Sequence, residues 1–233
     1  MEAGDILEPV RNISEAFTNL SRIAYYRRKI ISESNIISKI AHHHADDFIK
    51  DLTIFQEAHP DFIQRICLIK KVVITVQSKW MKAQLKELTR ESSKNNLGIL
   101  SDTTYKFFHQ GFLLTSSIYS PVLSRWIPIV FSYIRKEDEE HMKEHFRFLM
   151  DCLQDEMTSA EFEEALNHVV DFSSAEHNAF IQAYVDLGMS PHLALDPKMS
   201  EPMKAAHEYE LSSKAEGHLK GCEQHYRYDI FYY

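Results

Sequence analysis

The chain has 233 residues, of which 44% are hydrophobic and 26% charged, a composition typical of globular proteins and not of disordered chains. Lys and Arg number 26 and Asp and Glu number 34, so the formal net charge is −8. This charge argues against a protein that coats nucleic acid through its overall charge. The low counts of 6 glycines and 7 prolines exclude collagen-like and linker-like sequences.

The cysteines and the apolar runs indicate in which cellular compartment the protein is expected. Cys67, Cys152 and Cys222 are odd in number and far apart, which predicts free thiols in a reducing compartment. The acidic N-terminus lacks the apolar segment of a secretory signal. The longest apolar runs, at 72–76 and 127–131, are far shorter than the roughly 20 residues of a membrane helix. The sequence therefore predicts a soluble, intracellular protein without membrane contact.

Residues 1–95 are predicted to form a mostly helical N-terminal region, because apolar residues recur at helical spacing over 17–40. Within this region Pro60 interrupts a helix. The β-branched run at 72–76 predicts a strand or a buried helical segment. The polar stretch at 91–96 is typical of a turn and marks the predicted boundary.

Residues 96–190 are predicted to form a second domain that begins with three strands. Apolar and hydroxyl-bearing runs at 97–100, 112–119 and 126–134 have short connections, which predicts an antiparallel meander. A helix over 137–155 follows, because its apolar residues fall on one stripe. The members of this stripe are Met142, Phe146, Leu149, Met150 and Leu153.

A short strand at 169–170 is predicted to end at Asp171. Ser173 and Glu176 have the Ser-x-x-Glu spacing of a capping box, which predicts the start of a helix that runs to about residue 185. A further helix is predicted over residues 203–227. The predicted order is therefore β-β-β-α-β-α, a mixed α/β arrangement.

Two aspartates, Asp102 and Asp171, each follow an apolar run. In a sheet where these two strands are neighbours, both carboxylates emerge at the same end. Paired carboxylate oxygens suit Mg²⁺ or Mn²⁺, and two such ions about 4 Å apart can promote phosphoryl transfer. The alternative is that both aspartates are ordinary turn or cap residues.

Four motifs, the second of them a pair of strands, resemble Mutator-like (MULE) DDE transposases in this order along the chain. They are residues 98–108 with Asp102, the two strands at 113–120 and 126–133, the acidic segment 170–176 with Asp171, and the Cys-x-x-His motif of Cys222 and His225. The resemblance covers roughly residues 70–230. It implies a ribonuclease H-like fold, Mg²⁺ or Mn²⁺ as cofactor, DNA as partner and a nuclear location. By position, Asp102 corresponds to the first catalytic, metal-binding acid and Asp171 to the second.

The sequence departs from the family pattern after this motif. In the family a third acid, a glutamate, lies well beyond the Cys-x-x-His motif, whereas no glutamate follows Glu223 here. We therefore expect an incomplete ribonuclease H-like core, truncated before the third acid and lacking the last strand of its sheet. Residues 191–233 are then the helical start of the family's insertion region.

Three functional interpretations follow from this departure. The first is a transposase fragment from a metal-dependent DNA strand cleavage and transfer enzyme, with weak or no activity because a metal ligand is missing. The second is a non-catalytic remnant that binds DNA or protein. The third is a decayed transposon product without function.

Basic residues at two places are candidates for DNA contact. Arg27, Arg28 and Lys29 follow two tyrosines, and Lys70 and Lys71 precede the predicted strand at 72–76. Basic side chains beside aromatic ones can bind phosphates and bases. An ordinary solvated surface is the alternative at both places.

Cys222 and His225 have the spacing of one half of a zinc site. A structural zinc needs about four ligands, and no second Cys/His pair lies nearby in the sequence, so zinc is not expected. The aromatic segment from Tyr226 onward suggests an exposed patch that supports docking or self-association.

Overall fold

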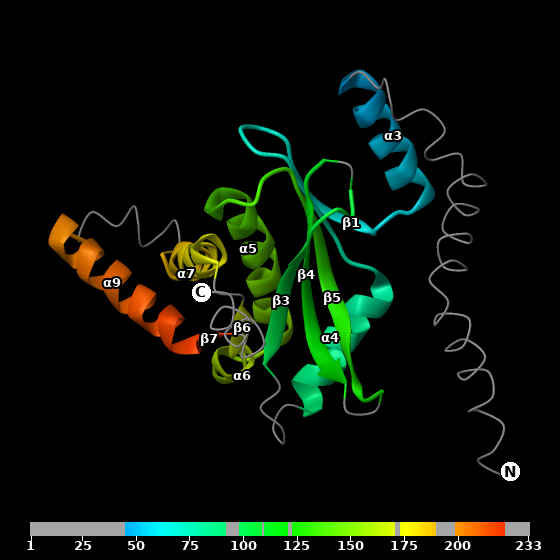
Figure 1. Ribbon diagram of the computed structural model, residues 1–233. Helices are drawn as coiled ribbons and strands as arrows, with labels where there is room; N and C mark the ends of the chain where they lie inside the picture. The colour runs from blue at the N-terminus through cyan, green and yellow to red at the C-terminus, as the bar shows by residue number, and fades with distance from the viewer. Residues whose placement is uncertain are drawn as a thin grey trace, which may run out of the picture. The chain divides into compact units, whose positions relative to one another are not determined.

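The computed structural model describes residues 45–91, 98–108, 110–120, 123–170, 173–189 and 199–221 (Figure 1). Contacts divide the chain into two units, Met1–Ala58 and His59–Tyr233. In the first unit the described element is helix α3 (Ala45–Ala58). The division therefore falls at Ala58/His59 and not at the predicted boundary of 95/96.

The described strands of the second unit form one seven-stranded sheet with the order β1-β2-β5-β4-β3-β6-β7. Strands β1 to β5 pair antiparallel with one another. Strand β6 pairs parallel with β3, and β7 pairs parallel with β6. The predicted mixed α/β class is confirmed, as is the antiparallel meander. The strand bounds are β1 Ile63–Cys67, β2 Val73–Val76, β3 Ile99–Thr104, β4 Phe112–Ser120, β5 Arg125–Ile134, β6 His168–Val170 and β7 Leu219–Gly221.

Helices of the second unit pack mainly around α5 and α7, and α7 lies between α5 and α9 (Figure 1). Their bounds are α4 Lys79–Glu91, α5 Glu139–Glu156, α6 Ser159–Ala165, α7 Ser174–Gly188 and α9 Glu201–His218. The helix predicted at 137–155 is α5, and all five residues of its apolar stripe are buried. In the described part of the chain, no helix has the length and apolarity that crossing a membrane requires.

The two faces of the sheet differ in burial because side chains alternate along each strand. On β4, Leu114, Ser116 and Ile118 are buried, and the residues between them are half-buried. On β3, Ser101 is buried and the adjacent Asp102 is exposed. We call the face that carries Asp102 the Asp102 face. The opposite face packs against α5 and holds the hydrophobic core, whose burial stabilises the fold.

A row of buried polar side chains crosses the core face and links four strands to α5. Ser101 Oγ lies 2.6 Å from Ser116 Oγ, and Thr75 Oγ1 lies 2.9 Å from Ser132 Oγ. His145 on α5 joins the two pairs, with Nε2 at 2.7 Å from Ser116 Oγ and Nδ1 at 2.7 Å from Ser132 Oγ. We call these five residues the hydroxyl row.

The strand register explains why the imidazole is needed. Ser101 lies directly opposite Ser116, and Thr75 directly opposite Ser132, close enough for hydroxyls to bond. Ser116 and Ser132 are diagonal neighbours, because Ser132 is opposite Leu114. Diagonal neighbours are roughly 7–8 Å apart, and the ring of His145 spans this gap.

Two local predictions differ from the structure. Residues around β1 were predicted to be helical, but Ile63–Cys67 is an edge strand paired with β2. The predicted capping box at the start of α7 does not form, since the Ser173 side chain makes no cap hydrogen bond. Glu176 is buried, with 1% of its surface exposed, and so points into the protein. A capping box forms instead at α6, between Thr158 and Glu161.

The C-terminal part of the sheet is more complete than predicted. The helix predicted at 203–227 corresponds to α9, which ends at His218. Leu219–Gly221 then forms β7, which pairs with β6. The prediction that the sheet lacks its last strand is therefore wrong. Residues 222–227 lie outside the described part of the chain.

Gly98, immediately before β3, permits a close approach to the segment before β6. Ile99 N donates a hydrogen bond to Asn167 O at 2.8 Å, and a Cβ on Gly98 would lie 2.6 Å from the same oxygen. We expect Gly98→Ala to lower the free energy of unfolding by about 1–3 kcal/mol through this overlap, as measured by urea denaturation.

The matched control is Gly217→Ala within α9. A Cβ at this position meets nothing within 4 Å, so this variant should be more stable by up to about 1 kcal/mol, because alanine is the better helix former. Equal effects of the two substitutions would contradict the steric explanation.

Candidate functional site

Strands β3 and β6 are parallel neighbours, so they end at the same edge of the sheet. Leu100 of β3 is paired with Val169 of β6. Asp102 lies two residues beyond Leu100, and in the sequence Asp171 lies two residues beyond Val169. The structure thus brings together the two strands that the sequence analysis expected to be neighbours. Asp171 itself lies outside the described residues.

Asp102 is an exposed side chain near the end of β3. It lies opposite Thr115 of β4, and its carboxylate forms no hydrogen bond or ion pair with another residue in the described ranges. Its oxygens are therefore accessible to a ligand. Across the same ranges, no group of three or more His, Cys, Asp or Glu side chains could hold a metal ion.

The two lysines proposed for DNA contact have different surroundings in the structure. Lys70 is exposed and has a positive φ of 67° in the turn between β1 and β2. Lys71 Nζ lies 2.7 Å from Glu144 Oε1, with 17% of its side chain exposed. Burial would lower the pKa of Lys71, but the hydrogen bond and nearby charges, mainly of Glu144, outweigh burial and raise it. Lys71 is therefore held in an ion pair, whereas Lys70 faces solvent.

The other predicted site residues lie outside the described part of the chain. They are Arg27, Arg28 and Lys29 on the N-terminal side, and Cys222 and His225 on the C-terminal side. The Cys-x-x-His motif begins directly after β7 in the sequence.

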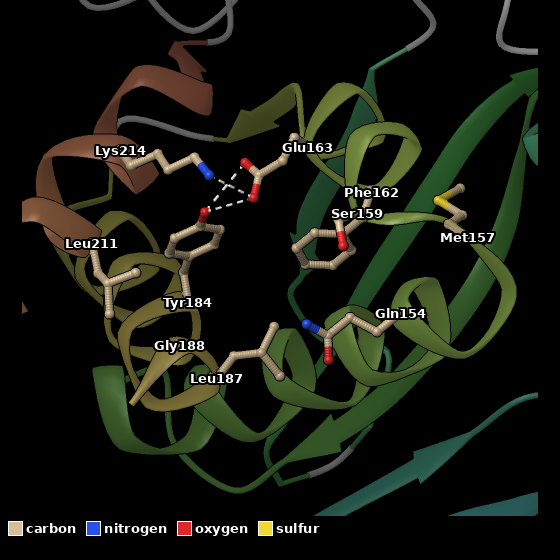
Figure 2. Close-up of a pocket in the computed structure, with 10 residues that line it drawn as sticks. All are labelled: Gln154, Met157, Ser159, Phe162, Glu163, Tyr184, Leu187, Gly188, Leu211 and Lys214. Carbon is tan, nitrogen blue, oxygen red and sulfur yellow. Dashed lines mark hydrogen bonds and ion pairs between the residues drawn. The ribbon is translucent and has the colours of Figure 1, made fainter. Parts of the chain in front are cut away.

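A second candidate site is a pocket of about 420 Å³ among α6, α7, α9 and the end of α5 (Figure 2). Figure 2 shows Lys214 and Tyr184 converging on the carboxylate of Glu163, with Leu187 and Phe162 on the apolar side. The pocket is lined by Gln154, Met157, Ser159, Phe162, Glu163, Tyr184, Leu187, Gly188, Leu211 and Lys214.

Glu163 connects three helices through its two oxygens. Tyr184 Oη of α7 donates to Oε1 at 2.9 Å, and Lys214 Nζ of α9 lies 2.8 Å from the same oxygen. His218 Nε2, at the end of α9, lies 2.9 Å from Oε2. Burial would raise the pKa of Glu163, but the hydrogen bonds from these three side chains outweigh burial and lower it. Both oxygens are thus engaged inside the protein, which favours a structural role over metal binding.

This cluster was not predictable from the sequence, because no local motif connects its members. Glu163, Tyr184, Lys214 and His218 come from three helices and meet only after α9 has packed on α7. Comparison with protein-family models, with curated proteins and with solved structures found no match to the chain. The functional assignment therefore depends on the residues and on the topology of the sheet.

Proposed function

We propose that the chain carries a metal-dependent phosphodiester site of the Mutator-like DDE transposase type, with Asp102 and Asp171 as metal ligands. The observation that supports this most is the parallel pairing of β3 and β6, the strands after which these two aspartates lie. The order β3-β4-β5-α5-β6-α7, with α6 between α5 and β6, agrees with the β-β-β-α-β-α order of a ribonuclease H-like core. DNA is the proposed partner.

The donor set fits a magnesium or manganese ion that keeps several water ligands. Mg²⁺ is commonly held by one or two carboxylates and completes its octahedron with water and substrate phosphates. When bound, such an ion activates a water and stabilises charge on the phosphate. The exposed carboxylate of Asp102 would hold it where a nucleic-acid strand can reach.

Weak metal binding and weak or absent strand cleavage are part of the proposal. Two carboxylates fix the position of an ion less well than three, and a misplaced ion reduces the reaction rate steeply. A chain with this donor set is proposed to bind the metal but to process DNA poorly.

The test is Mn²⁺ binding, measured by calorimetry on the full chain. We expect the double variant Asp102→Asn/Asp171→Asn to bind Mn²⁺ about tenfold or more weakly than the wild type, a loss of about 1.4 kcal/mol. The control is Glu208→Gln, which removes one negative charge from the exposed surface of α9 and should not change the affinity. A folded wild type without Mn²⁺ binding, or a double variant that binds equally well, would refute the site.

The second candidate function is a non-catalytic module that binds nucleic acid. It is favoured by the exposed aromatic side chains Phe107 and Phe108 just beyond β3. Binding of DNA that persists without any divalent metal, together with absent Mn²⁺ binding, would select this function over the first.

A further inference from the structure

The turn between β3 and β4 folds aromatic side chains onto the Asp102 face. Gly111, with φ of 80°, lies so close to β5 that a Cβ would be 2.6 Å from Ile134 O and 2.7 Å from the ring of Tyr133. The turn is therefore pressed against Tyr133. The ring centroid of Phe108 lies 5.0 Å from that of Tyr133, and the centroid of Phe107 lies 4.9 Å from that of Phe108.

The rings of this cluster remain accessible. Phe107 is 47% exposed and Phe108 is 36% exposed, and Tyr133 is half-buried. Edge-to-face packing stabilises the cluster internally, while two large apolar side chains stay in contact with solvent. A contiguous exposed apolar group on a folded surface commonly marks a binding site.

The cluster lies on the same face of the sheet as Asp102. Asp102 is opposite Thr115, which is opposite Phe131, and Tyr133 is two residues further along β5 on the same face. Two strand spacings and one two-residue step put Tyr133 and Asp102 roughly 12 Å apart along the sheet. One extended ligand could therefore contact both.

Two basic residues are close to these aromatic residues along the chain. Lys106 lies in the turn, Arg135 follows β5, and both are exposed; neither forms an ion pair with another residue that the structure describes. Arg135 is near Tyr133, whose pKa is raised by burial and lowered to a lesser extent by this guanidinium.

The acids at this edge of the sheet are partly engaged elsewhere. Glu137 Oε1 accepts a hydrogen bond from Tyr105 Oη at 2.5 Å, and Asp138 caps α5 and bonds His141. Glu139 and Glu140 follow in the first turn of α5. In the described residues none of these four acids forms an ion pair with Lys106 or Arg135, so both cations can meet an anionic ligand.

We propose that Phe107, Phe108 and Tyr133, together with Lys106 and Arg135, form a platform for an unpaired nucleic-acid strand. Aromatic faces stack on any base, and basic side chains track the phosphates, which is the general mode of single-strand binding. A duplex keeps its bases stacked on one another and offers none to these rings. This inference rests on the proposed function in one respect: it names the form of nucleic acid that would reach the proposed metal site at Asp102.

The test is fluorescence anisotropy of the full chain with labelled probes of about 12 nucleotides, a length within the usual site size. The probes are oligo(dT), oligo(rU) and a DNA duplex, in EDTA and low salt. We expect tighter binding of a single strand than of the duplex, and the first two probes separate DNA from RNA. Phe107→Ala/Phe108→Ala should weaken single-strand binding about tenfold or more.

The control is Tyr209→Ala on α9, a side chain that is 77% exposed and lies outside the platform. This substitution should not change the binding. Arg135→Gln should weaken binding and lower the slope of log affinity against log salt by about one. If thermal melting shows that the Phe107→Ala/Phe108→Ala variant does not fold, the Arg135→Gln result decides whether the platform binds the strand.

The inference is overturned if a folded double phenylalanine variant binds like the wild type, or if the duplex binds as well as the single strand. Failure of the proposed metal site is a separate result. Strand binding is measured in EDTA and Mn²⁺ binding is measured without nucleic acid, so the two results are independent. Strand binding without Mn²⁺ binding therefore refutes the metal site alone, and the reverse result refutes the platform alone.

Discussion

His145→Ala should destabilise the protein by about 3–5 kcal/mol, measured by urea unfolding and tryptophan fluorescence. His145 is fully buried and its two ring nitrogens bond Ser116 and Ser132. The substitution removes both hydrogen bonds, leaves two buried hydroxyls with fewer partners and opens a cavity, and each of these losses costs about 1–3 kcal/mol.

Two comparisons separate the causes of this effect. His207→Ala removes a histidine from the surface of α9, where 31% of its side chain is exposed, and should cost less than about 0.5 kcal/mol. Replacing the whole hydroxyl row, with His145→Leu, Ser101→Ala, Ser116→Ala, Ser132→Ala and Thr75→Val, should recover part of the loss, because apolar replacement of every partner leaves no unsatisfied hydroxyl in the row. A loss as small as that of His207→Ala would contradict the structural role of the hydroxyl row.

The free energy of unfolding should fall as the pH drops below about 6.5. Burial lowers the pKa of His145 from 6.5 to about 3, so between these values the unfolded chain binds a proton that the folded protein does not. The contribution of neutral His145 is fully present above pH 6.5. It declines by about 1.4 kcal/mol per pH unit as the pH falls toward 3.

The measurement is urea unfolding at pH values from about 5 to 7.5, on wild type and His145→Gln. The carboxylates with lowered pKa values, Asp138, Glu161 and Glu163, lose their contribution only below their ordinary values of 3.8 for Asp138 and 4.5 for the two glutamates. Between pH values of about 5 and 7.5, the change in the free energy of unfolding therefore reflects mainly the titration of histidines. Glutamine does not titrate, so His145→Gln should show a shallower slope, and parallel slopes would contradict the prediction.

Most of the elements that sequence patterns predicted are long ones whose burial follows a regular period, although the three-residue strand β6 was predicted as well. The apolar stripe of α5 and the long strands β4 and β5 have enough residues for such a period to appear. Strands β1 and β7 have five and three residues, too few to distinguish from a helix. Their state depends on pairing with β2 and β6, which local sequence does not encode.

The candidate site was predictable only in part for the same reason. Asp102 and Asp171 could be linked in advance through the family resemblance and on the condition that their strands are neighbours, and β3 and β6 are parallel neighbours. The hydroxyl row was not anticipated, because serine in a strand is ordinarily an exposed residue. Ser116 and Ser132 are buried because His145 reaches them from another element, a contact separated by at least 13 positions in the chain.

The parallel pairing of β7 with β6 also fixes where the chain leaves the sheet. Gly221 ends β7 level with Ser101 of β3, the residue before Asp102, and the two strands are separated by β6 alone, so Gly221 lies roughly 10 Å from Ser101. A group attached after Gly221 is thereby tethered close to Asp102. A short tether of this kind holds a group at an effective concentration on the order of millimolar, so a ligand contributed from that side would need little intrinsic affinity to join Asp102 in the proposed metal site.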